Sequence, residues 1–317
     1  MGITTIAQWL SEKPRHTTGI RTLQFCIGAA ICFRIATELP FARYLWGPDG
    51  IAADNSSQQF FGVSVGSKLD TLFYSSNAGI YSLIAILLVS ALLLMLHVQT
   101  RAASLFGAFA LILLELRLPA INDGGDNISR LVLLYMVLII SNPHKENLGR
   151  SKIWVHNIGV AAIILQLVIL YATSGFMKAT GEKWQNGTAM YIISHVEWFS
   201  LPGFREMFTN PAITTFATYV PMTFMILFPV AIFSRFKFLW IGAGICFHMG
   251  IAYFMGLLTF SLVMIGLELF LISDQEYSLL SRYARGIQDR IIHTPVSKKI
   301  MSTIKGVFVV KNILKTK

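Results

Sequence analysis

The sequence predicts an all-α, polytopic integral membrane protein with about eight transmembrane helices. Of its 317 residues, 54% are hydrophobic and 13% are charged, whereas a typical soluble domain has about 25% charged residues. The mean hydropathy is +0.61. The apolar residues are gathered in runs close to the roughly 20 residues that a helix needs to cross a bilayer. These observations together favour a multi-pass membrane protein over a soluble domain.

Eight apolar runs are the candidate spans. In chain order they lie at about 18–40, 79–97, 101–120, 127–142, 153–176, 212–233, 237–255 and 257–273. The first run carries Arg34 and Glu38 and lacks a clean small-x-small cleavage site near its end, so it is interpreted as a membrane helix and not as a signal peptide. The second and third runs, and the last two, are predicted to form tight hairpins.

The distribution of basic residues indicates the orientation. With the N-terminus in the cytoplasm, every predicted inner loop carries lysine or arginine, and the segment after Ser273 adds nine basic residues against three acidic ones. Positive charge collects on cytoplasmic segments, so an even number of spans with both termini inside is expected. The predicted parts are a cytoplasmic segment at 1–17, a transmembrane domain at 18–273 and a basic cytoplasmic tail at 274–317. The net charge of +10 therefore does not indicate a nucleic-acid partner.

The basic tail has two open interpretations. Apolar residues near helical spacing between lysines indicate an amphipathic helix on the anionic inner leaflet; they are Ile300, Ile304, Val307 and Leu314. A partly disordered, solvated tail is the alternative.

Charged residues inside spans are costly, so each is a candidate for function or for a structural ion pair. In the predicted topology most of them gather toward the outer ends of the spans: Arg34, Glu38, Glu115, Arg117, Asp123, Asp126, Arg130 and Lys178. His248 lies about 10 Å below the outer end of its span, and Glu268 is expected apart from the others, near an inner end. The group forms either a set of buried ion pairs or one outward-facing site.

Lys178, which ends the fifth run, also has two interpretations. As an anchor it would reach lipid phosphates, with Trp184 in the aromatic belt. As a neutral amine it would be a competent general base or nucleophile. The amphipathic stretch after it, AMYIISHVEWFSLPGF, is typical of an interfacial helix over the mouth of such a site. His248 is either a hydrogen-bonded core histidine or an acid–base group; no second histidine follows at helical spacing, so no metal site is predicted.

Three segments resemble one family. RIATELPFARYLWGPDGI, SGFMKATGEKWQNGTAMY and FHMGIAYFMGLLTF are similar to segments of the HTTM family, the membrane domains that resemble vitamin K-dependent γ-carboxylase. The resemblance covers about 18–273. It implies that Lys178 stands where the carboxylase has the lysine base that deprotonates vitamin K hydroquinone, and hence a quinone cofactor. In contrast to that enzyme, no large extramembrane domain that would bind a propeptide is expected from this sequence.

Within the family, the compact size, the DGGDNI hairpin and the basic tail are most similar to the sporulation-delaying protein B group. Those bacterial membrane proteins mature a secreted peptide toxin and act with a small partner protein. The resemblance implies an inner-membrane protein that matures a secreted antimicrobial peptide by carboxylase-like, quinone-dependent chemistry.

The hypothesised roles follow from this function. Lys178 is the base, His248 its hydrogen-bonding or acid–base partner, and the orienting side chains are Arg34, Asp126, Arg130 and Trp184. The expected partners are the lipid bilayer, a secreted peptide precursor and a small protein. Two alternatives stay open: a vitamin K-dependent glutamyl carboxylase, or a non-catalytic immunity or chaperone factor for the toxin.

Overall fold

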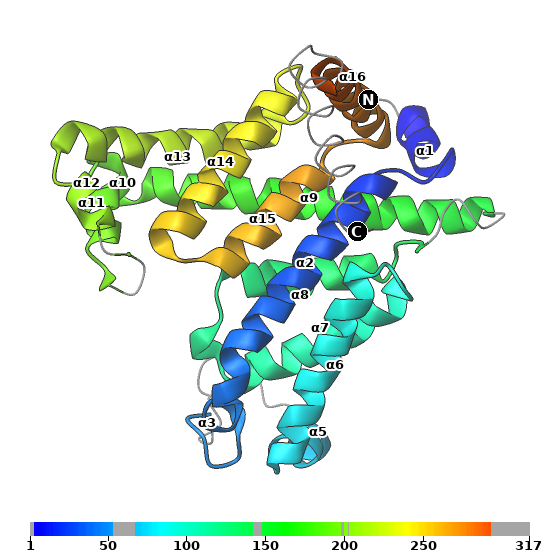
Figure 1. Ribbon diagram of the computed structural model, residues 1–317, viewed down its shortest axis with the longest axis vertical. Coiled ribbons are helices and arrows are strands. Elements are labelled where there is room, and N and C mark those ends of the chain that lie inside the picture. The colour runs from blue at the N-terminus through cyan, green and yellow to red at the C-terminus, as the bar shows by residue number, and fades with distance from the viewer. Residues whose placement is uncertain (1–2, 53–66, 142–147, 198–199, 202, 293–317) are drawn as a thin grey trace, which may run out of the picture. The chain divides into compact units, whose positions relative to one another are not determined.

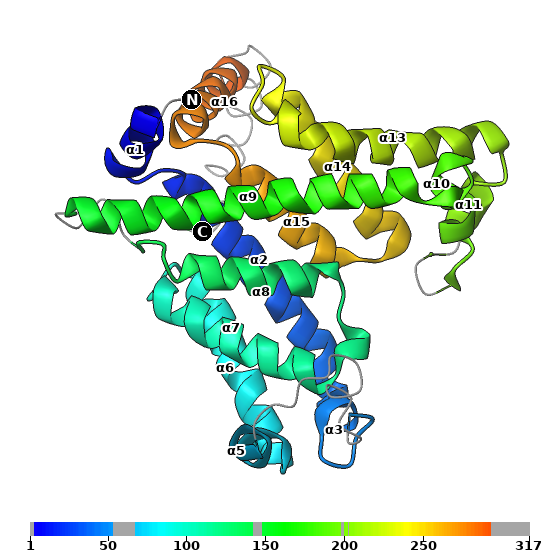
Figure 2. The ribbon, with the colours of Figure 1, turned by 180° about the vertical axis from the view of Figure 1, so that it is seen from behind.

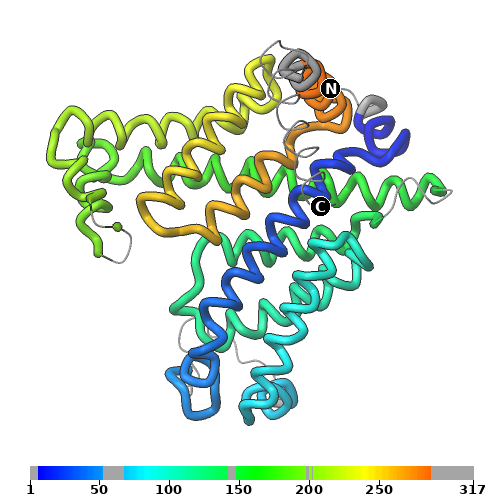
Figure 3. Tube along the Cα trace, in the orientation of Figure 1, coloured from blue at the N-terminus to red at the C-terminus, as the bar shows by residue number. Residues whose placement is uncertain are grey.

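The computed structural model describes residues 3–52, 67–141, 148–197, 200–201 and 203–292. The chain divides into two compact units, Met1–Leu271 and Ile272–Lys317. Throughout the described residues, every regular element is a helix (Figures 1 and 3). The tail helix considered for Ile300 to Leu314 lies outside the described residues.

Each of the eight predicted runs coincides with a helix of the first unit. These helices are α2 (Thr17–Glu38), α6 (Asn77–Met95), α7 (Thr100–Arg117), α8 (Gly124–Met136), α9 (Arg150–Thr180), α13 (Pro211–Ala231), α14 (Lys237–Met255) and α15 (Leu258–Phe270). Shorter helices join them: α1 (Ile3–Ser11), α3 (Ala42–Trp46), α5 (Ser67–Leu69), α10 (Glu182–Gln185), α11 (Ala189–Ser194) and α12 (Phe204–Met207).

Five of the described helical segments are long and apolar enough to cross a membrane. They are Thr17–Trp46, Asn77–Met95, Arg150–Thr180, Pro211–Ala231 and Lys237–Met255. The number becomes six if α15 and the first part of α16 (Asp274–Ile292) count as one broken span. The remaining runs fall short because α7 carries three charged residues and α8 has only 13 residues. The coarse prediction is therefore confirmed as an all-helical chain with five or six candidate spans.

Local sequence explains where several helices begin and end. Ser76 caps α6 by accepting a hydrogen bond from the Gly79 amide, and Asn210 caps α13 ahead of a proline at its first position. At the start of α8, Asp123 and Asp126 form a reciprocal capping box. Gly256 ends α14 with φ of 69°, a conformation that glycine adopts without strain.

Small residues allow α2 to lie between α6 and α15. A Cβ at Gly28 would be 2.6 Å from the Ala91 carbonyl oxygen, and one at Gly19 would be 2.7 Å from the Phe270 carbonyl oxygen. Gly266 on α15 approaches Cys26 equally closely. Glycine at such positions lets helix backbones come together in a membrane, where packing replaces the hydrophobic effect between helices. Larger side chains here would separate the three helices.

The 31-residue helix α9 contacts helices from early and late in the sequence, namely α1, α8, α10 and α13. Figures 1 and 2 show α13 on one side of it and α8 on the other, whereas α14 crosses it. A Cβ at Gly175 would be 2.8 Å from the Ile226 amide nitrogen, so α9 and α13 also pack with almost no gap. Tyr171, fully buried, is stacked on Phe228 at this contact.

Two buried polar residues of α9 hold the N-terminal segment. The Asn157 amide donates to the carbonyls of Leu10 and Lys13 at 2.9 Å and accepts from the Arg15 amide at 3.1 Å. His156 Nδ1 accepts from the Ile140 amide at 3.1 Å, which leaves Nε2 to donate to the Arg15 carbonyl at 3.0 Å. The segment that carries α1 is therefore fixed by side chains from the middle of the sequence.

The second unit contains the amphipathic helix α16. Its start is fixed by Ser273, whose amide and hydroxyl both donate to the Glu276 carboxylate at 2.7 Å.

Candidate functional site

Arg34 and Asp126, two of the predicted orienting residues, form an ion pair. Arg34 Nη1 lies 2.5 Å from Asp126 Oδ1, and Arg34 Nε donates to both carboxylate oxygens of Glu38 at 3.0 and 3.1 Å. The Glu38 contact spans four residues of α2, as the sequence indicates. Asp126 pairs with Arg34 while it also belongs to the capping box, in which its Oδ2 accepts from the Asp123 amide and its own amide donates to Asp123 Oδ1.

Arg130, the third orienting residue, pairs with a carboxylate that the hypothesis gave no role. Its Nη1 lies 2.6 Å from Glu115 Oε2, and Glu115 on α7 is 3% exposed. Asn122 links the two pairs, since its amide donates to the Glu115 carbonyl and its oxygen accepts from Arg34. We call Arg34, Glu38, Glu115, Asp126 and Arg130 the charge cluster. Each member already has a partner of opposite charge, so the cluster fixes α2, α7 and α8 together.

Lys178 lies at the end of α9, over an aromatic ring. Its Nζ is 5.0 Å from the centre of the Trp184 ring, within the range of a cation–π contact. Gly181 ends α9, and the short helix α10 then turns Trp184 back toward Lys178. Lys183 instead is exposed and lies 3.3 Å from Glu182. The two lysines are thus in different surroundings. The sequence indicates this difference, because Lys178 ends the apolar run and Lys183 lies five residues beyond it.

Lys178 and Trp184 border an apolar cavity of about 480 Å³. Side chains from α11 to α15 complete its walls; those with aromatic rings are Phe204, Phe208, Phe216, Phe247, Phe254 and Phe260. Met190 and Ile193 of α11 also line it, so part of the predicted interfacial stretch borders this cavity. Trp198, Phe199 and Pro202 of that stretch lie outside the described residues. We call this cavity the Lys178 pocket.

His248 belongs to a separate, fully buried network. The Tyr171 hydroxyl oxygen lies 2.6 Å from Glu268 Oε1 and 2.9 Å from His248 Nε2, both within hydrogen-bond distance. His248 Nε2 is 3.6 Å from Glu268 Oε1. Tyr171 and Glu268 are 0% exposed and His248 is 1% exposed. We call these three residues the Tyr–His–Glu triad.

The triad corrects the expected position of Glu268, which the sequence placed apart from the other polar residues. α14 and α15 form an antiparallel hairpin, and Gly244 on α14 leaves room for the Glu268 carboxyl group, which a Cβ would overlap. Glu268 is therefore a neighbour of His248. Tyr171 was missed as a site residue, although it lies seven residues before Lys178 and so on the same face of α9.

Two phenylalanines connect the triad to the Lys178 pocket. The ring centres of Phe247 and Phe260 lie 5.1 and 5.5 Å from that of His248, and both phenylalanines line the pocket. Phe260 also contacts the start of α8, where a Cβ at Gly125 would be 2.7 Å from the Phe260 Cα atom. Lys178 thus lines the pocket, and His248 lies behind two of its aromatic rings. Asp126 of the charge cluster follows Gly125 directly in the sequence.

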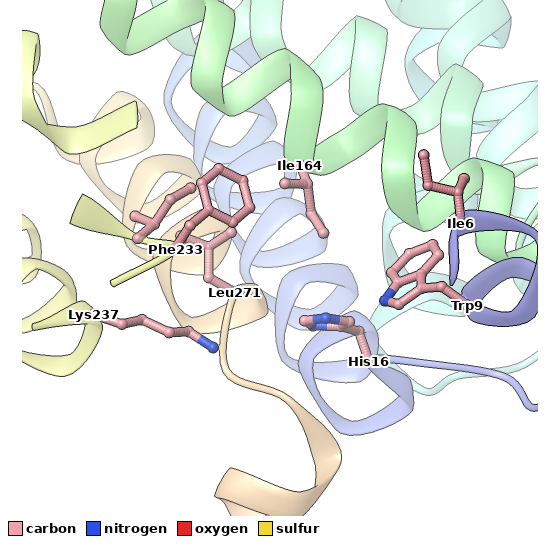
Figure 4. Close-up of a pocket in the computed structure, with 8 residues that line it drawn as sticks. Ile6, Trp9, His16, Ile164, Phe233, Lys237 and Leu271 are labelled. Carbon is pink, nitrogen blue, oxygen red and sulfur yellow. The ribbon is translucent and has the colours of Figure 1, made fainter. Parts of the chain in front are cut away.

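A second cavity, of about 380 Å³, lies near the N-terminal segment. Figure 4 shows Ile6 and Trp9 of α1 on one side of it and Phe233 and Lys237 on the other, with Ile164 of α9 between them. The residues proposed from the sequence do not line this cavity. Within the described residues, no group of three or more His, Cys, Asp or Glu side chains is arranged to hold a metal ion.

The fold and the site define a class: an all-helical protein with several candidate membrane spans and a buried polar network beside an apolar pocket. The chain is similar to the uncharacterized protein YitO of Bacillus subtilis (strain 168), with 23% identity over 181 residues. The match covers 51% of this chain and 58% of YitO, so the chain spans little more than half of that relative. No protein-family model matches the chain. No solved structure matches it either.

Proposed function

We propose that this chain is an HTTM-type, γ-carboxylase-like membrane protein that matures a secreted antimicrobial peptide, with Lys178 as the base. One observation carries the proposal: Lys178 is the only charged side chain among the described residues that line the pocket. The amine thus stands where an apolar group would be held by aromatic and aliphatic walls. Partial removal from water favours the neutral amine, which is the form that accepts a proton.

The proposed cofactor is a quinone. The cavity volume of about 480 Å³ lies within the usual range for small-ligand sites. Phe247, Phe254 and Phe260 would hold an aromatic ring, and Lys178 would hydrogen-bond its polar substituent and accept its proton. When bound, a hydroquinone would supply the reducing chemistry that protein side chains lack. Trp184 would fix the lysine while the ammonium form exists.

The proposed topology has eight spans, with both termini in the cytoplasm of a bacterial cell. In this arrangement α7, α8 and α15 cross with the five longer helices, and Glu115, Asp126, Arg130 and Glu268 have partners in the charge cluster and the triad. Lys178 then opens toward the outer face, where a secreted peptide precursor arrives. A small partner protein would act with the chain at that face.

The mass of the secreted peptide tests this function. Cells that produce the candidate precursor would carry wild-type protein, Lys178→Ala or Lys178→Arg at equal abundance, with Lys183→Ala as the matched control. Both Lys178 variants are expected to yield peptide without the mature mass change, and Lys183→Ala the wild-type product. An unchanged product from both Lys178 variants would remove the catalytic role. γ-Carboxyglutamate in the product would identify the glutamyl carboxylase alternative.

A non-catalytic immunity or chaperone role is the second candidate. The contact between Lys178 and Trp184 favours it, since a cation held over a ring is also a stable anchor. This candidate predicts that active, unmodified toxin leaves cells that lack the protein, provided that export is supplied in another way.

A further inference from the structure

Glu268 lies in a place where a carboxylate charge has little compensation. The side chain is 0% exposed, and among the described residues its polar partners are Tyr171 and His248. An isolated carboxylate in such surroundings is very costly, and the group normally takes up a proton instead. The triad is therefore expected to hold one additional proton, so that it does not bury a Glu268 carboxylate beside a neutral histidine.

We propose that the Tyr–His–Glu triad is a proton relay. One transferable proton rests on Glu268 and passes through the Tyr171 hydroxyl to His248, beside the Lys178 pocket. This assigns Tyr171 and Glu268 a role in moving protons and makes His248 the end of the relay that lies behind Phe247 and Phe260 of the pocket wall.

The hydrogen-bond distances allow both arrangements of the proton. At rest, protonated Glu268 donates to the Tyr171 oxygen, and the Tyr171 hydroxyl donates to Nε2 of neutral His248, across 2.6 and 2.9 Å. On transfer, the Glu268 O–H bond breaks as the proton joins the Tyr171 oxygen, while the original Tyr171 proton moves to His248 Nε2. Glu268 becomes a carboxylate and His248 an imidazolium. The total charge of the triad is unchanged.

At each end of the triad one buried polar atom has no hydrogen-bond partner among the described residues, which a purely structural network would not require. Glu268 Oε2 and His248 Nδ1 are buried and have no hydrogen-bond partner among the described residues, although most buried polar atoms have one. The His248 ring also contacts Phe247 and Phe260, which line the pocket. His248 itself does not line the pocket, so in the relay the imidazolium Nδ1 proton reaches a proton-accepting ligand there past these two rings. This last transfer rests on the proposed function, whereas the position of the proton within the triad does not.

Infrared spectroscopy of the purified full-length protein at neutral pH tests the relay. The difference between wild type and Glu268→Gln is expected to show one protonated carboxyl band. Tyr171→Phe should shift that band, because the carboxyl group loses its hydrogen-bond partner. Tyr135→Phe is the matched control, since this tyrosine donates to Gln166 outside the triad, and its spectrum should equal that of wild type.

Two results would overturn the relay. One is a Glu268→Gln difference spectrum that contains only an ionised carboxylate band; the other is a carboxyl band that Tyr171→Phe leaves unmoved. If Glu268→Gln does not fold, wild-type protein labelled with ¹³C at its glutamate carboxyl groups and compared with Tyr171→Phe gives the same decision. Because these spectra need no peptide substrate, a failure of the proposed function in the Lys178 variants is distinguishable from a failure of the relay.

Discussion

At the residue scale, buried charges are balanced by short ion pairs. Glu115 is nearly inaccessible, and its Oε2 atom pairs with Arg130 at 2.6 Å while Oε1 has no hydrogen-bond partner among the described residues. The stability of this region therefore depends on Arg130 more than its partly exposed position indicates.

Arg130→Ala is expected to destabilise the protein by about 1–3 kcal/mol, because it leaves a buried carboxylate without its partner. The measurement is thermal unfolding of the detergent-solubilised protein. Adding Glu115→Gln should recover part of the loss, since the buried charge is then removed. A double variant no more stable than Arg130→Ala alone would contradict this account.

Asn157 makes a second residue-scale prediction. Asn157→Ala removes the hydrogen bonds to Leu10, Lys13 and Arg15, so the N-terminal segment should loosen. Trypsin is expected to cut after Arg15 faster than in wild type, whereas the bond after Lys13 resists trypsin because Pro14 follows it. Thr173→Ala is the control, because this exposed side chain on the same helix bonds only within α9. Equal cleavage rates in all three proteins would show that Asn157 does not hold the segment.

The site residues could be predicted only in part from sequence. Arg34 and Glu38 lie four residues apart on one helix, so their pairing follows from helical spacing. The pairing of Arg130 with Glu115 depends on how α7 meets α8, and that of His248 with Glu268 on the glycine at 244. Such contacts are set by the packing of separate helices, which spacing along one helix does not determine.

At the element scale, the packing of α14 on α15 depends on residue 244 being a glycine. Gly244→Ala would push a Cβ into the Glu268 carboxyl group, whereas Gly242→Ala meets nothing within 4 Å. We expect Gly244→Ala to lower the unfolding temperature, although alanine favours helices more than glycine does. Gly242→Ala should leave it unchanged or raise it. Equal unfolding temperatures for the two variants would mean that Glu268 does not pack against α14 as described.

The existence of the eight helices could be predicted because each carries a long apolar run. Their lengths were less predictable: the predicted run 127–142 corresponds to α8, which ends at Met136, and 153–176 to α9, which extends to Thr180. The boundaries follow from caps and turns such as the Asp123 capping box and Gly181. These local signals are weaker in the sequence than apolar runs.

At the scale of the whole molecule, orientation is the property that apolar runs alone do not fix. The proposed topology puts Lys183 outside and the α6–α7 turn, with Gln99, inside. Single cysteines at these positions, in a variant without Cys26, Cys32 and Cys246, should differ in labelling by a membrane-impermeant maleimide. Lys183→Cys is expected to react in intact cells, and Gln99→Cys only after the membrane is opened. The reverse pattern would invert the proposed orientation and place the Lys178 pocket on the cytoplasmic side.

The central claim is that the Lys178 pocket is the working site, and filling the pocket tests it most directly. Gly250 lines the pocket, and a Cβ there meets nothing within 4 Å, so Gly250→Leu should fill the cavity without disturbing the fold. Gly242→Leu is the control, because Gly242 is equally open but lies outside the pocket lining. The measurement is binding of an isoprenoid quinone to purified protein, followed by quenching of tryptophan fluorescence. We predict that wild type and Gly242→Leu bind it and that Gly250→Leu does not, with equal unfolding temperatures; unchanged binding by Gly250→Leu would contradict the claim.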